Sequence, residues 1–432
     1  MDWTKQWLDA HMTKRPRSQD DAECLNSLLG IFRCCVDSAR PDRCLPGHLP
    51  ELNDRGRTVI AGIGKGGAEM ARVAEAQYND GDYSGVVVTK TGHGYASDRL
   101  AIHEGGHPVP NASGVAGARA LVDSLRGLSS DDHLVALVSG GGSSLLTIPP
   151  DGTTLDEIAA LNRALLASGM EIGQMNAVRR HVSPLANGGL ARAAHPAQVT
   201  LLAISDVAGD DISVISSGPF SPDGSTPADA LALLDRRGIS VSEALRSHLK
   251  NSSTTGPMAK VQARLVASPG TALQAAETAA RQAGYDVILL GDDLCGESRE
   301  VAAQHARLAM KIYNEGRRGV VILSGGETTV TLRGPGLGGS NREYALALAV
   351  ALDTAEGIHA VIADTDGTDG EGETAGASVA PDTLVRAQEL GVSADDHLAR
   401  NDSGRFFASL GDDLVTGPTM TNVNDFRAIM IA

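Results

Sequence analysis

The chain has 432 residues, which is enough for two or three domains, and 42% of them are hydrophobic, which is enough for full cores. Its 50 glycines and its aromatic content of only 3% are typical of closely packed α/β domains. The formal net charge of −16 argues against nucleic acid or an anionic membrane as the main partner. Binding an anionic substrate would require local positive charge or N–H donors, from Lys, Arg, helix N-termini or a metal ion.

No apolar stretch is long enough to span a bilayer, and the first residues lack the basic and apolar regions of a signal peptide. The five cysteines are odd in number and show no paired C-x-x-C spacing, so we expect free thiols in a reducing compartment. These features predict a cytoplasmic protein. We expect a monomer or a homodimer with no nucleic-acid or membrane partner.

Strand and helix patterns alternate along most of the chain. This alternation predicts parallel sheets with helices between their strands. In chain order we expect a helix at 22–39, a strand at 58–61, a helix at 68–77, strands at 85–89 and just before 103, a helix at 114–125, a strand at 134–138, a helix at 155–167, a strand at 200–204, helices at 228–235 and 241–250, a strand at 260–266, a helix at 271–283, a strand at 287–290, a helix at 297–314, a strand at 320–323, a helix at 340–352, and strands at 359–363 and 412–416.

The most linker-like stretch is Asn251-Ser-Ser-Thr-Thr-Gly-Pro257. Its small polar residues, glycine and proline are typical of a domain boundary. We therefore expect an N-terminal domain over residues 1–250 and a C-terminal domain over residues 258–432.

The first glycine-rich loop, Gly62-Ile-Gly-Lys-Gly-Gly67, lies between the first expected strand and a helix. It matches the dinucleotide fingerprint G-x-G-x-x-G. The match is weak because the next strand ends at Lys90, where an NAD enzyme usually places an acidic residue. The loop puts Lys65 at a strand-to-helix turn, where a lysine can reach a phosphate. The alternative is a solvated loop lysine.

Two further stretches of the first domain carry polar side chains next to expected strands. His107 precedes Pro108, which holds it extended, and it is a candidate to line a cleft or else a structural loop histidine. The second glycine loop, Ser139-Gly-Gly-Gly-Ser-Ser144, adds hydroxyl groups to the backbone donors of Gly140 and Gly141. Such a loop after a buried strand is suited to holding an anion.

A basic cluster, Arg179, Arg180 and His181, stands out in this acidic chain. One face of a helix cannot hold all three side chains, so we expect some of them to be solvated. Asp206 follows the strand at 200–204, and open α/β sheets place their chemistry just past the C-terminal ends of strands. Asp206 is therefore a candidate for magnesium ligation or general base work, and the alternative is a helix N-cap.

The longest glycine-rich stretch runs from Gly325 to Gly339, after the strand at 320–323. Ser340 and Glu343 have the spacing of a capping box, which places a helix start at 340. Glycines before a helix N-terminus predict a cradle for an anion or a phosphate, and the alternative is a flexible hairpin without a ligand.

An acidic, glycine-rich loop follows the strand at 359–363 and runs from Asp364 to Glu373. It does not have the residue pattern of an EF-hand. A magnesium–nucleotide site needs only one or two carboxylates plus phosphates, which Asp366 and its neighbours can supply. The alternative is an acidic surface turn. The last stretch, residues 417–424, carries small polar donors suited to a hydroxylated ligand.

Together these motifs resemble the glycerate 2-kinase family, the type II glycerate kinases whose C-terminal module is called MOFRL, and some members of this family are labelled hydroxypyruvate reductase. The motifs span nearly the whole chain in the family's order. They are Gly64-Lys65, Gly106-His-Pro-Val-Pro110, Ser139-Gly-Gly-Gly-Ser143, Asn176-Ala-Val-Arg-Arg-His181, Ser205-Asp-Val-Ala-Gly-Asp210 with Ser217-Gly-Pro219, Gly325-Gly-Glu-Thr-Thr329, Thr365-Asp-Gly-Thr-Asp-Gly370 and Gly417-Pro-Thr-Met-Thr-Asn-Val-Asn424.

The resemblance implies a Rossmann-like N-terminal domain with a three-layer, mainly parallel sheet, a second α/β domain that contains the MOFRL module at about residues 319–428, and a site in the cleft between them. It implies ATP-dependent phosphorylation of the 2-hydroxyl of D-glycerate to 2-phosphoglycerate, with Mg²⁺ or another divalent cation. The implied site residues are, for catalysis, Lys65, Asp206 and Arg342; for substrate binding, Ser143, Arg179, His107 and Asn341; for nucleotide binding, Gly140, Gly141, Gly325, Gly326, Glu327 and Asp366; and for the metal, Asp206 and Asp366.

The sequence departs from the family pattern in three ways. The glycine–lysine pair is followed by Gly66-Gly67 instead of alanine-type residues, and Asn187 stands where the family has a lysine. The family arginine at position 340 is replaced by Ser340, and an arginine lies two positions later at Arg342. Two positions along a helix start turn a side chain by more than half a turn. The substrate can therefore also be a related hydroxy acid.

Two other functions are compatible with parts of the sequence. An NAD(P)H-dependent hydroxypyruvate reductase uses Gly62–Gly67 but leaves the other glycine loops and the acidic loop without a role. A regulator that binds a nucleotide or a sugar phosphate without catalysis uses the loops but turns over no hydroxy acid. The kinase uses all of these motifs, because phosphoryl transfer depends mostly on positioning and charge neutralisation.

Overall fold

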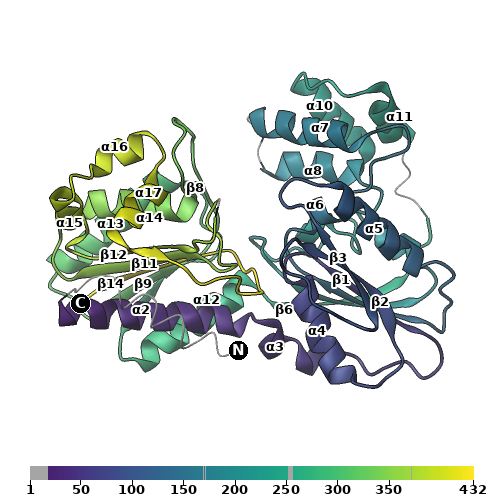
Figure 1. The fold of residues 1–432 in the computed structure, drawn as a ribbon, viewed down its shortest axis with the longest axis horizontal. Coiled ribbons are helices and arrows are strands. Elements are labelled where there is room, and N and C mark those ends of the chain that lie inside the picture. The colour runs from purple at the N-terminus through teal and green to yellow at the C-terminus, as the bar shows by residue number, and fades with distance from the viewer. Residues whose placement is uncertain (1–17, 169, 171, 252–255, 371) are drawn as a thin grey trace. The chain divides into compact units, whose positions relative to one another are not determined.

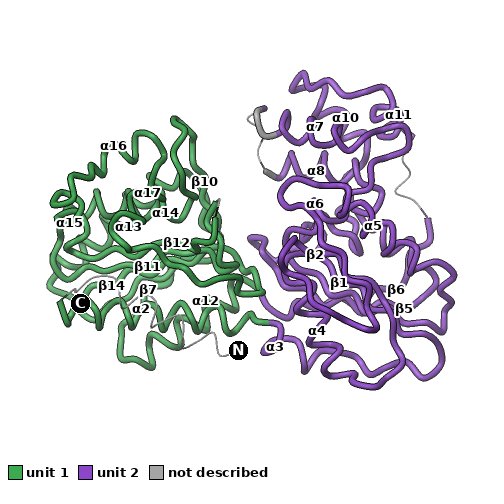
Figure 2. Tube along the Cα trace, viewed as in Figure 1, with its two compact units in different colours: residues 1–40, 268–432 green, residues 41–267 purple. Residues whose placement is uncertain are grey.

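The computed structural model describes residues 18–168, 170, 172–251, 256–370 and 372–432 (Figure 1). It divides the chain into two compact units (Figure 2). Unit 2 is Pro41–Ala267, and unit 1 joins the residues up to Arg40 with Ser268–Ala432. Residues 252–255 of the predicted linker lie outside the described residues, as do residues 1–17, for which we predict no signal peptide.

Unit 2 is built on a six-stranded sheet in which every strand pair is parallel. Its elements are α3 (Pro41–Cys44), η1 (Pro46–His48), β1 (Thr58–Ile63), α4 (Gly67–Tyr78), β2 (Ser84–Lys90), β3 (Leu100–Gly105), α5 (Ala112–Ser124), β4 (His133–Val138), α6 (Gly142–Leu145), α7 (Leu155–Ala167), α8 (Ile172–Val182), α9 (Gly189–Ala193), β5 (Gln198–Ile204), η2 (Ile215–Ser217), α10 (Pro227–Arg236), α11 (Glu243–Asn251) and β6 (Lys260–Ala267).

The strand order of this sheet is β3-β2-β1-β4-β5-β6, which is the order of Rossmann folds. The predicted Rossmann-like domain is therefore confirmed. The order reverses between β1 and β4, so the loops that follow these two strands lie at the topological switch point. Open α/β sheets bind their ligands at this point.

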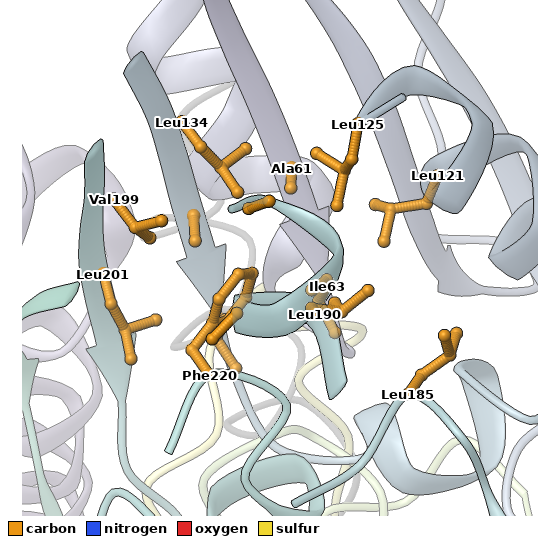
Figure 3. Close-up of a cluster of buried hydrophobic side chains, with 14 of the residues drawn as sticks. Ala61, Ile63, Leu121, Leu125, Leu134, Leu185, Leu190, Val199, Leu201 and Phe220 are labelled. Atoms are coloured by element: carbon orange, nitrogen blue, oxygen red, sulfur yellow. The ribbon is translucent and has the colours of Figure 1, made fainter. Parts of the chain in front are cut away.

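Both faces of the sheet are covered, as a parallel sheet requires. On one face, Ala61 and Ile63 of β1 belong to a buried cluster with Leu121 of α5 and Leu190 of α9 (Figure 3). The alternate residue Ile60 is also fully buried, and α4 packs against β1 and β2. Helices α7, α8, α10 and α11 form a group of their own with a separate apolar core (Figure 1).

Unit 1 contains a second six-stranded sheet, ordered β13-β12-β11-β14-β9-β7, with helices on both faces (Figure 1). Helices α2 and α12 cover one face, while α13 and α14 lie on the other. Its elements are α2 (Gln19–Ser38), α12 (Pro269–Gln282), β7 (Asp286–Leu289), β8 (Gly296–Glu297), α13 (Ser298–Asn314), β9 (Val320–Ser324), β10 (Thr328–Thr329), α14 (Ser340–Leu352), β11 (Ile358–Asp364), β12 (Gly376–Val379), α15 (Thr383–Glu389), α16 (Ala394–Ala399), α17 (Ser403–Leu410), β13 (Asp413–Leu414) and β14 (Asp425–Ile431).

The second sheet is mixed, so the prediction of parallel sheets is wrong for unit 1. Only β7 and β9 pair in parallel within it, and the other four strand pairs are antiparallel. Two of these antiparallel pairs involve β14, the last strand of the chain, which inserts between β9 and β11 and runs against both. The other two join β12 to β11 and to β13. The two-domain α/β class predicted from the sequence is nevertheless confirmed.

The five cysteines are all described and form no disulfide, which confirms the expected free thiols. Burial raises the pKa of the Cys35 thiol to about 12. None of the described helices combines the length and the apolar character that crossing a bilayer demands.

Candidate functional site

The loop after β1 is held by the loop after β4. Gly64 has a φ of +100°, and a Cβ at this position would overlap the backbone of Ser139. The backbone N–H of Lys65 donates to the carbonyl oxygen of Gly140 at 2.9 Å, and that of Gly66 donates to Ser139 Oγ at 2.8 Å. These N–H groups are therefore engaged within the protein, whereas a dinucleotide fingerprint would offer them to a pyrophosphate.

The loop after β4 is fixed in turn by two serines of η2. Ser216 Oγ donates to the carbonyl oxygen of Ser139 at 2.6 Å and accepts from the N–H of Gly142 at 3.0 Å. The hydroxyl groups of Ser143 and Ser217 lie 2.7 Å apart. The loop at 139–143 thus has a defined shape before any ligand binds, as a binding site requires.

Lys65, Asp206 and His107 all lie against this loop. A Cβ at Gly140 would overlap the carboxylate of Asp206, so only glycine fits beside this side chain. A Cβ at Gly141 would lie 3.1 Å from Lys65 Cγ and 3.1 Å from His107 Cε1. The loop therefore has a cationic and an anionic side chain against adjacent residues, at the ends of β1, β4 and β5. No helix begins at Asp206, and the next helical element is η2.

A cavity of about 580 Å³ opens beside the loop. Its polar lining includes His107, Ser143, Ser144 and Arg179, and His107 Nδ1 lies 2.8 Å from Ser144 Oγ. The remaining wall includes Leu146, Ile158, Leu161 and Val182, supplied by α6's C-terminal end, α7 and α8. We call it the Arg179 cavity. It brings together three of the predicted substrate-binding residues.

Arg179 is held in this cavity by neutral partners. Its Nε donates to Asn162 Oδ1 at 2.9 Å, and its Nη1 donates to Asn176 Oδ1 at 3.2 Å. Among the residues that the structure describes, no ion pair includes Arg179, and burial lowers its pKa. A half-buried guanidinium without a carboxylate partner is suited to binding a carboxylate or a phosphate. Asn162, which positions it, had no signal in the sequence.

The other two members of the basic cluster are not solvated, so that prediction is wrong. Arg180 and His181 are only 7% and 4% exposed. Arg180 forms an ion pair with Asp223, and His181 Nε2 lies 2.9 Å from Ser225 Oγ. Arg179 lines one cavity and its two neighbours line another, so α8 divides the cluster between two sides.

In unit 1, helix α14 begins at Ser340 as predicted, but the predicted capping box is wrong. The N-cap is Gly339, and the carboxylate of Asp369 accepts from the N–H groups of Asn341 and Arg342 at 2.9 and 3.0 Å. The predicted phosphate cradle at this helix start is therefore filled by the protein's own carboxylate. Glu343 is buried and paired with Arg299 instead of capping the helix.

The side chains of Arg342 and Asn341 are also engaged. Arg342 Nε donates to Asp369 Oδ2 at 3.0 Å, and its Nη2 donates to the Asp369 carbonyl oxygen at 2.7 Å. Asn341 Nδ2 donates to Asp425 Oδ1 at 2.6 Å. Burial raises the pKa of both carboxyls, to about 6 for Asp425. These contacts favour a positioning role for Arg342, and its catalytic role stays a prediction.

The remaining predicted nucleotide-binding residues also lie in unit 1. Arg427 Nη1 donates to the carbonyl oxygens of Gly325 and Gly326 at 2.8 and 3.2 Å, and a Cβ at Gly326 would overlap the backbone of Leu294. Glu327 is exposed. Asp366 is only 6% exposed and accepts from the N–H of Thr368, so it is not part of an acidic surface turn.

The two carboxylates predicted as metal ligands lie in different units, Asp206 in unit 2 and Asp366 in unit 1. Within the described part of the chain, no group of three or more His, Cys, Asp or Glu side chains is arranged to hold a metal ion. A metal with mostly protein ligands therefore has no preformed site among these residues.

Comparison with known proteins identifies the family. Residues 27–250 match a domain of unknown function (DUF4147), and residues 320–425 match the MOFRL family. A D-glycerate 2-kinase from Thermotoga maritima is 36% identical over 94% of this chain and 98% of its own length. The chain belongs to the glycerate 2-kinase family.

Two further similarities extend this result. A crystal structure of glycerate kinase from Thermotoga maritima superimposes with a TM-score of 0.84 at 35% identity, covering 95% of this chain and 100% of that chain. A putative hydroxypyruvate reductase from Agrobacterium vitis is 46% identical over 95% of both chains. The glycerate 2-kinase family thus contains relatives with two different names, and only the site chemistry can decide between the two activities.

Proposed function

We propose that this protein transfers the terminal phosphoryl group of ATP to the 2-hydroxyl of D-glycerate, giving 2-phosphoglycerate. The observation that carries the proposal is the placement of Lys65 and Asp206 against adjacent residues of one glycine loop, at the switch point of the sheet. Phosphoryl transfer needs positive charge on the transferred group and a positioned acceptor hydroxyl. A lysine and an aspartate against adjacent residues of one glycine loop can supply both.

Each predicted catalytic or substrate-binding side chain of unit 2 has its own proposed role. Lys65 neutralises the negative charge of the moving phosphoryl group as a mobile point charge. Asp206 orients the acceptor hydroxyl and accepts its proton. Arg179 binds the carboxylate of glycerate, because its charge has no carboxylate partner among the described residues. His107 and Ser143 contact the hydroxyl groups of the substrate.

The kinase relatives imply ATP as the phosphoryl donor, and the donor set of unit 2 fits a divalent cation held mainly by phosphates. Asp206 is a half-buried carboxylate against a glycine loop, and Mg²⁺ at nucleotide sites uses one or two carboxylates and completes its shell with phosphate oxygens and water. Such a cation supplies charge neutralisation on the phosphates. In unit 1, Asp366, Gly325, Gly326 and Glu327 stay proposed nucleotide-binding residues.

The alternative function, NAD(P)H-dependent reduction of hydroxypyruvate, is disfavoured by the loop after β1. The N–H of Gly66 at the start of α4 is bound to Ser139 Oγ at 2.8 Å, and that of Lys65 is bound to Gly140. A dinucleotide-binding turn leaves these donors for the pyrophosphate. The end of β2 carries Lys90 where a ribose-binding acid is usual.

The proposal is tested with purified protein, D-glycerate, ATP and Mg²⁺, with enolase coupling to report the position of the phosphate. Hydroxypyruvate with NADH and with NADPH is assayed in parallel. We expect turnover that enolase detects directly, without a mutase, because the product is the 2-phosphate. Turnover with a reduced nicotinamide cofactor but not with ATP would reject the kinase.

A further inference from the structure

Lys65 lies in a turn whose own residues do not fix its conformation. It stands between Gly64 and Gly66, and glycine adopts many backbone conformations with similar ease. The direction in which the lysine side chain leaves the turn depends on the two peptide groups that flank its Cα atom. Hydrogen bonds to these peptide groups therefore decide where the ammonium group can reach.

The peptide group before the Lys65 Cα atom is held at both of its polar atoms. The carbonyl oxygen of Gly64 accepts from Thr89 Oγ1 and from the N–H of Gly67, each at 3.1 Å. The N–H of Lys65 donates to the carbonyl oxygen of Gly140 at 2.9 Å. Thr89 is fully buried near the end of β2, so this peptide group is fixed to the two strands that neighbour β1.

The peptide group after the Lys65 Cα atom is held by a histidine and a serine. The carbonyl oxygen of Lys65 lies 3.0 Å from His93 Nδ1, and since a carbonyl oxygen can only accept, this nitrogen is the donor. The N–H of Gly66 donates to Ser139 Oγ at 2.8 Å. Thr89 Oγ1 lies 3.5 Å from the same carbonyl oxygen, so the contact with His93 is the shorter one.

His93 is itself fixed by the fold. Its side chain is only 8% exposed. It stands in the turn that follows β2, and β3 holds this turn on both sides of the histidine. The N–H of Thr91 donates to the carbonyl oxygen of Gly105 at 3.0 Å, and the N–H of Gly94 donates to Glu104 Oε1 at 2.8 Å. The imidazole is therefore positioned before any substrate binds, as support for a catalytic group requires.

We propose that His93 is a positioning residue for phosphoryl transfer, because its Nδ1–H fixes the Lys65 carbonyl group and thereby directs the Lys65 ammonium group towards the transferred phosphoryl group. The inference rests on the proposed catalytic role of Lys65. His93 acts through the backbone and needs no contact with the substrate. A displacement of about 1 Å can lower a rate about 10²-fold, so loss of this contact should be visible in kcat.

The first test compares His93→Ala with His93→Asn in the enolase-coupled assay. Alanine removes the donor, whereas asparagine places an amide nitrogen close to the position of Nδ1. We expect kcat of His93→Ala to fall about 10- to 100-fold, while KM for glycerate changes about twofold at most, and His93→Asn to recover most of the loss. In the Lys65→Ala background, His93→Ala should lower kcat by about twofold at most, because the side chain that it positions is absent.

Hydrogen–deuterium exchange of residues 62–68 gives a second measurement, which does not depend on turnover. His93→Ala should speed the exchange of this segment, since the turn loses one of its contacts, and His93→Asn should keep it near the wild-type rate. The matched control is His133→Ala. His133 is also partly buried, and its Nε2 lies 2.9 Å from Thr200 Oγ1, but it is the first residue of β4, at the opposite end of the strand from the glycine loop. It should change neither kcat nor this exchange.

The proposal is overturned if His93→Ala keeps the wild-type kcat, if it leaves the exchange of residues 62–68 unchanged, or if Lys65→Ala is fully active. It is equally overturned if His93→Ala lowers kcat as much in the Lys65→Ala background as in the wild type, which is the result of a merely structural role. His93→Phe, which fills the space without a donor, replaces the alanine variant if circular dichroism shows that the latter is unfolded. A wild-type protein without glycerate kinase activity would instead reject the proposed function, and the exchange would then decide alone whether His93 holds the turn.

Discussion

Replacement of Arg179 by methionine tests substrate binding with a limited effect on the stability of the fold. The guanidinium is held by the amide oxygens of Asn162 and Asn176 at 2.9 and 3.2 Å, and no carboxylate of the described residues depends on it for charge balance. Arg179→Met therefore removes two hydrogen bonds to neutral partners, a loss of about 1–3 kcal/mol of stability. It leaves no buried carboxylate unpaired.

The expected loss of activity follows from the proposed contact between Arg179 and the substrate carboxylate. Hydrogen bonds between a guanidinium and a carboxylate contribute about 1.5–3 kcal/mol, and a factor of ten corresponds to about 1.4 kcal/mol. We expect kcat/KM for D-glycerate to fall about 10- to 150-fold. The change lies mainly in KM for glycerate, because the carboxylate is bound in the ground state and the transition state alike. The enolase-coupled assay at saturating ATP measures both constants.

Arg163→Met is the matched control, since Arg163 lines the same cavity from α7 but is exposed. An exposed side chain of this kind typically changes a free energy by about 0.5 kcal/mol or less, so kcat/KM should change about twofold at most. An Arg179→Met variant that is folded and keeps the wild-type KM for glycerate would refute the assignment of the carboxylate site. A rise in KM for ATP with an unchanged KM for glycerate would move Arg179 to the nucleotide.

Three further changes test other parts of the structure. Lys65→Ala should lower kcat about 10²- to 10³-fold in single-turnover measurements, as for loss of one charge-stabilising donor, and full activity would exclude its role. Arg342→Met should lower the free energy of unfolding in urea by about 3–5 kcal/mol, because it leaves the buried Asp369 carboxylate without its ion-pair partner. Adding Asp369→Asn should recover part of that loss. Additive losses in the double variant would contradict the pairing. Burial, together with the charge of Arg180, lowers the pKa of His181 from 6.5 to about 4. The stability that neutral His181 contributes is thus fully present above pH 6.5 and is lost as the pH falls towards 4, by about 1.4 kcal/mol per pH unit. In phosphate-free buffer, His181→Gln should make the free energy of unfolding less dependent on pH in this range.

The parallel sheet of unit 2 could be predicted because its signals are local. Its core strands are short apolar runs, and several of them, such as Leu134–Val138, are followed by a glycine loop and a helix. This repeating order constrains the connections to right-handed parallel crossovers. The strand at 260–267 was also recognisable, but nothing in its residues indicates that it pairs with β5 at the edge of this sheet.

The mixed sheet of unit 1 could not be predicted in the same way. Its central strand β14 is fully buried, but it begins with Asp425 and contains Arg427, which pair with each other. These two charged residues interrupt the apolar pattern by which a buried strand is recognised. Helix α2 packs on a sheet formed by residues more than 200 positions later, and His359 Nε2 lies 2.6 Å from Asp21 Oδ1 across that separation. Pairing over such a distance leaves no local pattern.

The glycine loops show how one signal can have two origins. In unit 2, glycine is required at 140 because Asp206 occupies the space that a Cβ would fill. In unit 1, Gly339 is required because Asp369 occupies the same kind of space at the start of α14. The sequence predicts a close approach in both places. It does not tell whether a ligand or the protein's own side chain makes that approach.

The same ambiguity applies to the arginines, and charge pairing resolves it. In unit 1, Arg299, Arg342 and Arg427 each lie against a buried carboxylate of the fold. Their charges are neutralised before any substrate arrives. Arg179 is surrounded by amide oxygens instead, so its positive charge persists inside a cavity of an acidic protein. An anionic substrate gains most where the protein has left a cation without its own partner. These surroundings favour Arg179 over Arg342 as the proposed partner of the substrate carboxylate, although both residues stand in the motifs of the family.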